Sequence, residues 1–303
     1  MPKLSVIVVF YNMKREAART LWSLHPEYQI GVCADDYEVI AVDNGSSQPL
    51  SSDDITQLGD NFRYVFYETD SVSPVAAVNA AMQMANGLNV ALIVDGARMA
   101  TPGLIRKTLD GLEKFENPFV CALSWHLGPD EQNLSMLKGY QQESEDRLLE
   151  IIQWPENGYK LFDIAAIAPS SLPGFYSGIP RECSWFAMRK AAFVELGGFD
   201  IQFQSAGGGL VNHDFRNRVM KMPNVRSVAL LGEGVFHQYH GGISTNVHAE
   251  TRTLTLDSFQ QEYKNIRGVE YTCQKSPSVT YVGDIPEQAL RFVHAQGKAE
   301  IDC

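Results

Sequence analysis

The side chains that could do chemistry follow short apolar runs, at the points where buried strands would give way to loops. A carboxylate in such a place can face a ligand, or it can close a turn by accepting backbone N–H groups. For each residue alone both alternatives stay open, and their convergence is the stronger signal. The polar residues that end these runs are Tyr11 and Asn12 after residues 4–10, Asp43 and Asn44 after 37–43, and Asp95 after 89–95.

Three more candidates lie in the second half of the chain. Asp214, in VNHDFRNRV, has a side chain suited to proton transfer, but it is equally an acid favoured at a helix N-terminus by the helix dipole. His237 and His240, in FHQYHGG, lie three residues apart beside a glycine turn. Two such imidazoles could ligate a metal ion or could be structural.

Strands and helices alternate through the first 125 residues and would position these side chains. Apolar runs predict strands over 4–10, 37–43, 62–68, 89–95 and 118–125, and helical spacing predicts helices over 15–24, 75–87 and 101–115. Such alternation predicts an α/β fold with a doubly wound, mostly parallel sheet flanked by helices. Ligands bind such sheets outside the carboxyl ends of the strands, where the polar residues above are expected.

The second half is less regular and has no linker that would divide the chain. We expect a helix over 143–154, a strand entering a helix over 183–200, a glycine-rich loop feeding a helix over 205–222, and two short strands over 227–242. The chain is therefore expected to form one domain. Its parts would be a nucleotide-binding half (1–125), an acceptor-binding and catalytic half (126–252), and a C-terminal helical or irregular extension (253–303).

Composition and charge narrow the partners and the compartment. The net charge of −11 argues against nucleic acid or an anionic membrane as the main partner. Five cysteines without CxxC spacing favour a reducing compartment over a disulfide framework or a zinc site. The first apolar run is short for a signal peptide, and no stretch approaches the roughly 20 apolar residues that span a bilayer. These features predict a cytoplasmic protein without a transmembrane segment.

Five segments occur in an order that carries more information than any one of them. They are LSVIVVFYN (4–12), YEVIAVDNGSS (37–47), AAVNAAMQMANG (76–87), ALIVDGA (91–97), and CSWFAMRKAAFVELGGFDIQF (183–203) together with NHD (212–214). In this order they resemble the inverting family 2 glycosyltransferases of the GT-A fold. The resemblance implies transfer of a sugar, with inversion, from a UDP- or GDP-sugar donor to a hydroxyl of a saccharide or other acceptor.

The resemblance also implies roles for individual residues. Asp214 would be the general base that takes the proton from the acceptor hydroxyl. Asp43 would accept a hydrogen bond from the nucleotide base, and Asp95 would lie at the ribose and diphosphate. The full set of donor-binding residues implied in this way is Phe10, Tyr11, Asn12, Asp43, Asn79, Asp95 and Arg98.

Departures from the family pattern concern the charge around the diphosphate. Ala97 stands where the second acid of the Asp-x-Asp motif would hold Mn²⁺ or Mg²⁺, and Val78 stands where the family has an arginine. Arg98 could replace part of the lost positive charge. Because Mn²⁺ accepts mixed carboxylate and imidazole ligands, we hypothesise that the metal ligands are Asp95, His237 and His240.

Three alternative functions compete with this one. A nucleotidyltransferase would carry a glycine-rich, basic loop after the first strand, whereas FYNMKREAA has no glycine. A dinucleotide-binding oxidoreductase would need G-x-G-x-x-G at the same place, which the sequence lacks. A non-catalytic nucleotide- or carbohydrate-binding module derived from a glycosyltransferase would explain the changes at Ala97 and Val78. Retention of Asp214 and of the histidine pair counts against that module.

Overall fold

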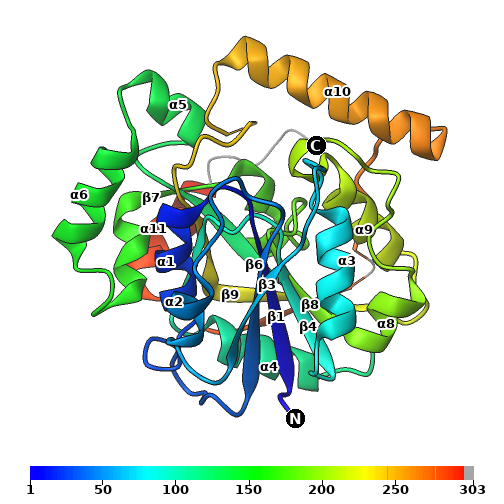
Figure 1. Cartoon of the computed structure of the whole chain (residues 1–303), viewed down its shortest axis with the longest axis horizontal. Coiled ribbons are helices and arrows are strands. Elements are labelled where there is room, and N and C mark those ends of the chain that lie inside the picture. The colour runs from blue at the N-terminus through cyan, green and yellow to red at the C-terminus, as the bar shows by residue number, and fades with distance from the viewer. Residues whose placement is uncertain (244, 277, 297–303) are drawn as a thin grey trace.

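A ten-stranded sheet forms the centre of the molecule, with helices on both of its faces (Figure 1). The computed structural model describes residues 1–243, 245–276 and 278–296. The strands are β1 (Leu4–Phe10), β2 (Tyr37–Asp43), β3 (Phe62–Phe66), β4 (Asn89–Ile93), β5 (Arg98–Ala100), β6 (Pro118–Leu127), β7 (Ala165–Ile167), β8 (Trp185–Arg189), β9 (Arg226–His237) and β10 (Val279–Val282). Their main order across the sheet is β10-β9-β6-β8-β4-β1-β2-β3, with β5 paired to β9 and β7 to β6.

The first four strands are parallel and end at one edge of the sheet. Phe10 on β1 lies level with Asp43 on β2, and Val8 lies level with Ile93 on β4. This register brings the loops after β1, β2 and β4 together. The strand β8 then runs antiparallel between β4 and β6, so the two halves of the chain share one sheet.

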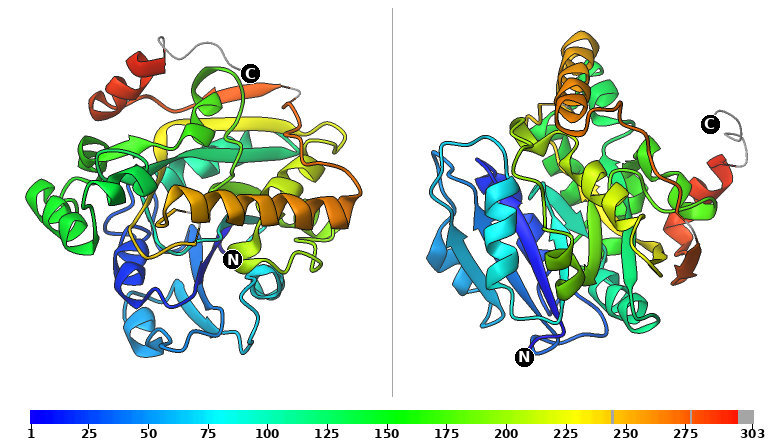
Figure 2. Two further views of the ribbon diagram at one scale, coloured as in Figure 1. Left: turned by 90° about the horizontal axis from the view of Figure 1, so that it is seen from above. Right: turned by 90° about the vertical axis from the view of Figure 1, so that its right-hand side faces the viewer.

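Helices cover both faces of the sheet, whereas α10 stands apart from them at the top of the molecule (Figure 2). They are α1 (Lys14–Trp22), α2 (Ser52–Thr56), α3 (Val75–Met84), α4 (Leu104–Glu113), α5 (Gln132–Leu137), α6 (Gln142–Ile152), α7 (Pro173–Tyr176), α8 (Lys190–Glu195), α9 (Val211–Val219), α10 (Ala249–Arg267) and α11 (Leu290–Gln296). Short 3₁₀ turns are η1 (Gly158–Ile164), η2 (Pro169–Ser171), η3 (Ala206–Gly208) and η4 (Glu287–Ala289). No helix in the described part of the chain is both long and apolar enough to cross a membrane.

Alternation along the strands feeds a separate core on each face of the sheet. On β1, Ile7 and Val9 pack in the core that includes α3, α8 and α9, whereas Val6 and Val8 pack in the core that includes α1 and α4. Each side chain buried in this way contributes about 1.5–3 kcal/mol. The helix α10 lies across the top of the molecule in Figure 1 and joins the first core through Phe259.

The structure confirms the predicted α/β class and the single domain with a mostly parallel sheet. All five strands predicted before residue 126 are present, with ends shifted by a few residues. The two short strands predicted over 227–242 are instead one strand, β9. A bulge absorbs the turn between them, because Ala122 pairs with Leu230 and the next residue, Leu123, pairs with Gly234. Gly232 in the bulge has φ of +73° and lies against the Asp284 backbone.

Candidate active site at the strand ends

A cavity of about 820 Å³ opens outside the carboxyl ends of the parallel strands. Its walls come from both halves of the chain: the loops after β1, β2 and β4, the end of β6, the start of α9, and α10. The candidate donor-binding residues that line it are Phe10, Tyr11, Asn12, Asp95 and Arg98. The strand register described above explains why these five residues meet.

Asp95 forms a cluster with the two predicted metal ligands. His237 Nε2 lies 2.7 Å from Asp95 Oδ2, and His240 Nε2 lies 3.6 Å from Asp95 Oδ1. The two Nε2 atoms are 3.2 Å apart. The strand β9 brings the histidines here because it pairs with β5, where Arg98 lies opposite His237. One ligand atom from each of the three residues lies within 4.8 Å of the others.

The hydrogen bonds of Gln132 fix the tautomer of His237. The Gln132 amide nitrogen donates to the His237 carbonyl at 2.7 Å, so the amide oxygen Oε1 must face the imidazole. Oε1 also accepts from Asn246 Nδ2 at 3.0 Å and lies 2.7 Å from His237 Nδ1. Nδ1 therefore carries the proton, and in the neutral ring the Nε2 lone pair points at Asp95. Burial lowers the pKa of His237 to about 4, against the opposing effect of Asp95.

Asp95 and His240 shift each other's pKa in opposite directions. Burial opposes ionisation of Asp95, but His240 and His237 outweigh it and hold the Asp95 pKa well below its usual range. Burial likewise opposes protonation of His240, but the Asp95 carboxylate outweighs it and raises the His240 pKa. The cluster thus concentrates one negative charge and two imidazole nitrogens at the wall of the cavity.

The donor set of this cluster fits a divalent metal ion. In the Nδ1–H tautomer, His237 Nε2 and Asp95 Oδ2 are two acceptors at 2.7 Å, an arrangement that a cation or a shared proton must bridge. One carboxylate and two imidazoles suit Mn²⁺ and related ions. Gln132 supplies the outer hydrogen bond that commonly orients a metal-ligating histidine. Asp95, His237 and His240 are therefore the residues that would hold the ion.

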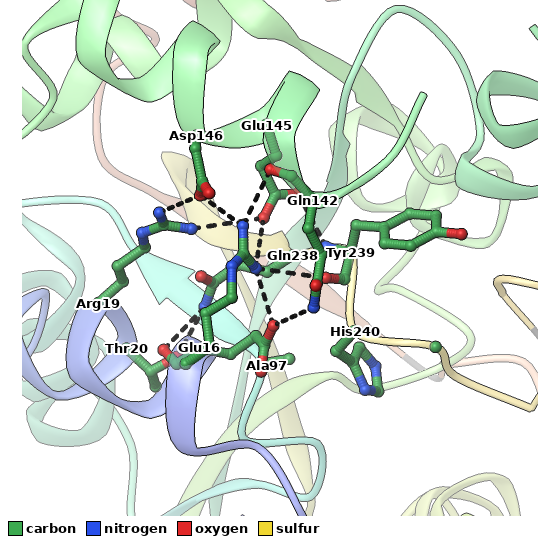
Figure 3. A network of polar contacts seen from close by, with 12 residues as sticks. Glu16, Arg19, Thr20, Ala97, Gln142, Glu145, Asp146, Gln238, Tyr239 and His240 are labelled. Atoms are coloured by element: carbon green, nitrogen blue, oxygen red, sulfur yellow. Dashed lines mark hydrogen bonds and ion pairs between the residues drawn. The ribbon is translucent and has the colours of Figure 1, made fainter. Parts of the chain in front are cut away.

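A polar network behind the cluster fixes the backbone that carries the histidines (Figure 3). Gln238 donates from its side chain to Thr20 Oγ1 at 3.0 Å, and from its backbone to the Ala97 carbonyl at 2.8 Å. The Tyr239 N–H donates to Glu145 Oε2 at 2.8 Å. Helices α1 and α6 thereby clamp the residues between His237 and His240.

Ala97 and Arg98 occupy the place of the missing second acid. Ala97 is fully buried, and its N–H donates to Asp95 Oδ1 at 3.2 Å. Arg98 donates to Ser124 Oγ at 2.8 Å and lies 3.6 Å from Asp95 Oδ2. The guanidinium thus lies beside the cluster on the cavity wall. This is the position that Arg98 needs if it is to replace part of the lost positive charge.

Asp43 does not face the cavity, and its neighbour Asn44 does. Both Asp43 oxygens accept backbone N–H groups, from Ser46 and Leu50, each at 2.9 Å, so this carboxylate closes the turn after β2. Asn44 lines the cavity, and its buried Oδ1 has no hydrogen-bond partner. The geometry does not support the predicted contact of Asp43 with a nucleotide base, and it favours Asn44 in that place.

Asn79 is also placed away from the cavity. Its side chain exchanges two hydrogen bonds with the Phe199 backbone, at 2.8 and 2.9 Å, and thereby joins α3 to the turn after α8. These bonds use both ends of the amide. The predicted donor contact of Asn79 therefore has no geometric support, because the amide is used between α3 and Phe199 and does not line the cavity.

Asp214 is occupied by ion pairs. Arg267 Nε donates to Asp214 Oδ1 at 2.6 Å, and Arg218 Nε donates to Oδ2 at 2.9 Å. The side chain is 2% exposed and does not line the cavity. The residues of α9 that do line it are Asn212 and His213. Each residue of a helix is rotated by about 100° from the next, so Asp214 points in a different direction from both. This placement does not support the expectation that Asp214 faces the acceptor.

Several cavity residues that the sequence analysis did not place among the donor-binding, catalytic or metal-binding residues carry polar atoms without partners. The buried atoms of this kind, among the described residues that line the cavity, are Asn44 Oδ1, His126 Nδ1, Glu182 Oε2, Asn212 Oδ1 and His213 Nδ1. Buried polar atoms are nearly always satisfied. Five unsatisfied atoms around one cavity indicate that a polar ligand completes them.

A doubly wound sheet with this site at its strand ends defines a protein of the GT-A type. Residues 5–166 match the family described as Glycosyl transferase family 2. The match spans more than half of the 303 residues, and the chain belongs to this family. Asp95 lies inside the matched segment, whereas both histidines lie beyond it.

Solved structures with the same fold share little sequence with this chain. Residues 1–349 of S. aureus TarS in complex with UDP match at 13% identity with a TM-score of 0.53, covering 87% of this chain and 72% of that one. The complex with UDP-GlcNAc matches at 14% identity and 0.54, covering 87% and 67%. This chain covers 43% of a longer TarS structure, at 13% identity and 0.51. A search among curated proteins finds no match.

Proposed function

We propose that this chain transfers a sugar from a nucleotide-diphosphate sugar to an acceptor hydroxyl with inversion, using a divalent metal ion. The observation that carries the proposal is the Asp95–His237–His240 cluster on the wall of the cavity. A catalytic cavity with a built metal site fits a transferase better than a module that only binds carbohydrate.

The donor fits the cavity half formed by residues 1–125. A volume of about 820 Å³ suits a nucleotide-sugar, since ligand pockets commonly span about 300–1,000 Å³. We favour a uridine donor over GDP. The related fold of TarS was solved with UDP and with UDP-GlcNAc. Asn44 Oδ1 is an acceptor without a partner and suits an imino N–H, which uracil and guanine carry and cytosine lacks.

Charge at the diphosphate would be balanced from two sides. A bound Mn²⁺ or Mg²⁺ neutralises developing negative charge on a leaving diphosphate. Arg98 adds a fixed positive charge beside it, held by Ser124. In this proposal Phe10, Tyr11 and Asn12 line the nucleotide, as the end of β1 does at the cavity wall.

The acceptor enters from the half formed by residues 126–252, and the C-terminal segment covers the cavity. Arg252, Leu256 and Phe259 of α10 line the cavity from above. Residues 297–303 of the predicted extension lie outside the described residues. The acceptor is a saccharide or another hydroxyl compound, and its proton must go to a base on the cavity wall other than the ion-paired Asp214.

A thermal-shift panel tests this function. The ligands are UDP, GDP and CMP, each with and without Mn²⁺, and the proteins are wild type, His237→Ala and the control His248→Ala, which changes an exposed histidine outside the cavity. Ligand at a hundredfold excess over Kd stabilises the folded state by about 2.7 kcal/mol. We expect a Mn²⁺-dependent shift with UDP in wild type and in His248→Ala, and its loss in His237→Ala.

Two other results would change the conclusion. A thermal shift with UDP that is the same with and without Mn²⁺ would indicate that Arg98, rather than a metal ion, balances the charge of the diphosphate. Nucleotide binding without turnover of any nucleotide-sugar would favour the non-catalytic module.

A further inference from the structure

Glu182 lines the cavity and has one carboxylate oxygen without a hydrogen-bond partner. It lies in the loop before β8 and lines the cavity together with Ser184. Its Oε1 accepts the hydroxyl of Ser171, whereas its buried Oε2 has no hydrogen-bond partner. Resting on the function proposed above, we propose that Glu182 is the general base that takes the proton from the acceptor hydroxyl.

The hydroxyl of Ser171 orients this carboxylate. Ser171 Oγ accepts the Ser124 N–H at 2.7 Å, so its own proton is directed to Glu182 Oε1. The Ser124 side chain in turn accepts from Arg98, which stands beside Asp95. One chain of contacts therefore links Glu182 to the residues expected at the diphosphate. A base held through one oxygen, with the other free, is the arrangement that proton transfer needs.

The backbone around Glu182 is also fixed. The Arg181 N–H donates to the Ser170 carbonyl at 3.0 Å, and Arg216 Nε donates to the Pro180 carbonyl at 3.1 Å. Cys183, the next residue, has φ of +49°, a left-handed conformation that few non-glycine residues adopt. This turn directs Glu182 and Ser184 to the cavity while the Cys183 side chain is buried in the core.

The other acids near the cavity are committed elsewhere. Among the described residues, the carboxylates that line it are Asp95, Glu131 and Glu182. Asp95 belongs to the histidine cluster. Glu131 Oε2 lies 3.7 Å from Arg252 of α10, so it pairs with the covering helix. Asp214 is outside the cavity and bonded to Arg218 and Arg267.

The step balances without any further reagent. Glu182 Oε2 accepts the proton of the acceptor hydroxyl as that oxygen attacks the anomeric carbon. The bond from the anomeric carbon to the phosphate oxygen breaks, and the nucleoside diphosphate leaves with the electron pair. Glu182 then releases its proton to solvent. With a single displacement the configuration at the anomeric carbon inverts.

Glu182→Gln is the test variant, because its amide oxygen can still accept from Ser171. The probes are UDP and UDP-GlcNAc with Mn²⁺, and the readouts are UDP affinity and UDP release with water as the acceptor. General base catalysis contributes about 10²–10⁴-fold. We expect Glu182→Gln to keep its UDP affinity within about twofold of wild type. Its rate of UDP release should fall by about 10²–10⁴-fold.

Two comparison variants distinguish the loss of a general base from a general loss of stability. Glu156→Gln changes an exposed acid after α6 and should match wild type. Asp214→Asn should melt earlier but keep its rate below the melting temperature. A Glu182→Gln protein that releases UDP within about threefold of the wild-type rate, far short of the factor expected for a base, would overturn the base while leaving the proposed function intact. A wild-type chain that binds neither UDP nor UDP-GlcNAc would overturn the proposed function and the base with it.

Discussion

Gln132 determines which nitrogen of His237 faces Asp95. Its amide donates to the His237 carbonyl and accepts at Oε1, so His237 must donate from Nδ1 and present Nε2 to Asp95 Oδ2 at 2.7 Å. The site thus depends on an uncharged residue of α5 that does not line the cavity.

Replacing Gln132 by alanine should weaken Mn²⁺ binding by about 10–100-fold, the usual cost of losing the outer partner of a metal-ligating histidine. His237 would then be free to rotate or to change tautomer. Titration of the protein with Mn²⁺, followed by calorimetry, measures the change. Gln57→Ala, an exposed glutamine after α2, serves as the control. Equal Mn²⁺ affinity in the Gln132 variant and wild type would contradict the role of Gln132.

Asn44→Ala should lower the affinity for UDP by about 2–10-fold, the range expected for one net hydrogen bond. It should also reduce the preference for UDP over CDP, because cytosine N3 has no proton to donate to Asn44 Oδ1. Asn61 provides a matched control: like Asn44, it donates from Nδ2 to backbone carbonyl oxygen and leaves a buried Oδ1 unpaired, but it lies outside the cavity. Competition binding with both nucleotides decides the matter, and parallel losses in the two variants would refute the assignment.

Glu145 should make stability depend on pH. Burial raises its pKa to about 7, against the opposing effects of the Tyr239 N–H, Arg15 and Arg19. Because the folded state then holds this proton up to a higher pH than the unfolded chain does, the Glu145 contribution to stability falls as pH rises from about 4.5 to 7.

Urea unfolding at a series of pH values from about 5 to 8 tests this dependence. The free energy of unfolding of wild type, minus that of Glu145→Gln, should decrease across the series. Glu143→Gln, on the exposed side of the same helix, should show a constant difference. A constant difference for Glu145→Gln as well would mean that the carboxyl is ionised throughout.

Asp214→Asn should destabilise the fold by about 3–5 kcal/mol, the usual cost of removing one partner of a buried ion pair, with some reduction because Arg218 and Arg267 are about one-quarter exposed. The loss reaches beyond α9, since Arg267 lies at the end of α10. Thermal melting measures the effect. An unchanged melting temperature with abolished turnover would restore Asp214 as a catalytic candidate.

The sequence predicted which strands end at the site better than which side chains enter it. Asp95, Arg98 and the two histidines could be found because strand ends and a paired-imidazole spacing are local patterns. Asp43 and Asn44 are neighbours with opposite surroundings, and only the path of the turn after β2 decides which one faces the cavity. In α9, a rotation of about 100° per residue separates Asn212 and His213 from Asp214 in the same way.

Gln132 and Glu182 gave no signal in the sequence for a different reason. Each acts on residues far along the chain, Gln132 on His237 and Glu182 through Ser171 and Ser124. Their partners are set by the pairing of β6 with β8 and β9, which periodicity along one strand does not reveal.

The antiparallel strand β8 sits between β4 and β6, although it follows both in the chain. During synthesis, β4 and β6 therefore emerge with a gap between them that only residues 185–189 can fill. The segment that matches the family ends before β8 and β9, so a chain truncated at residue 166 would leave β4 and β6 without these partners, and such unpaired strand edges are prone to aggregate. Both the sheet and the site therefore need residues from the second half of the chain.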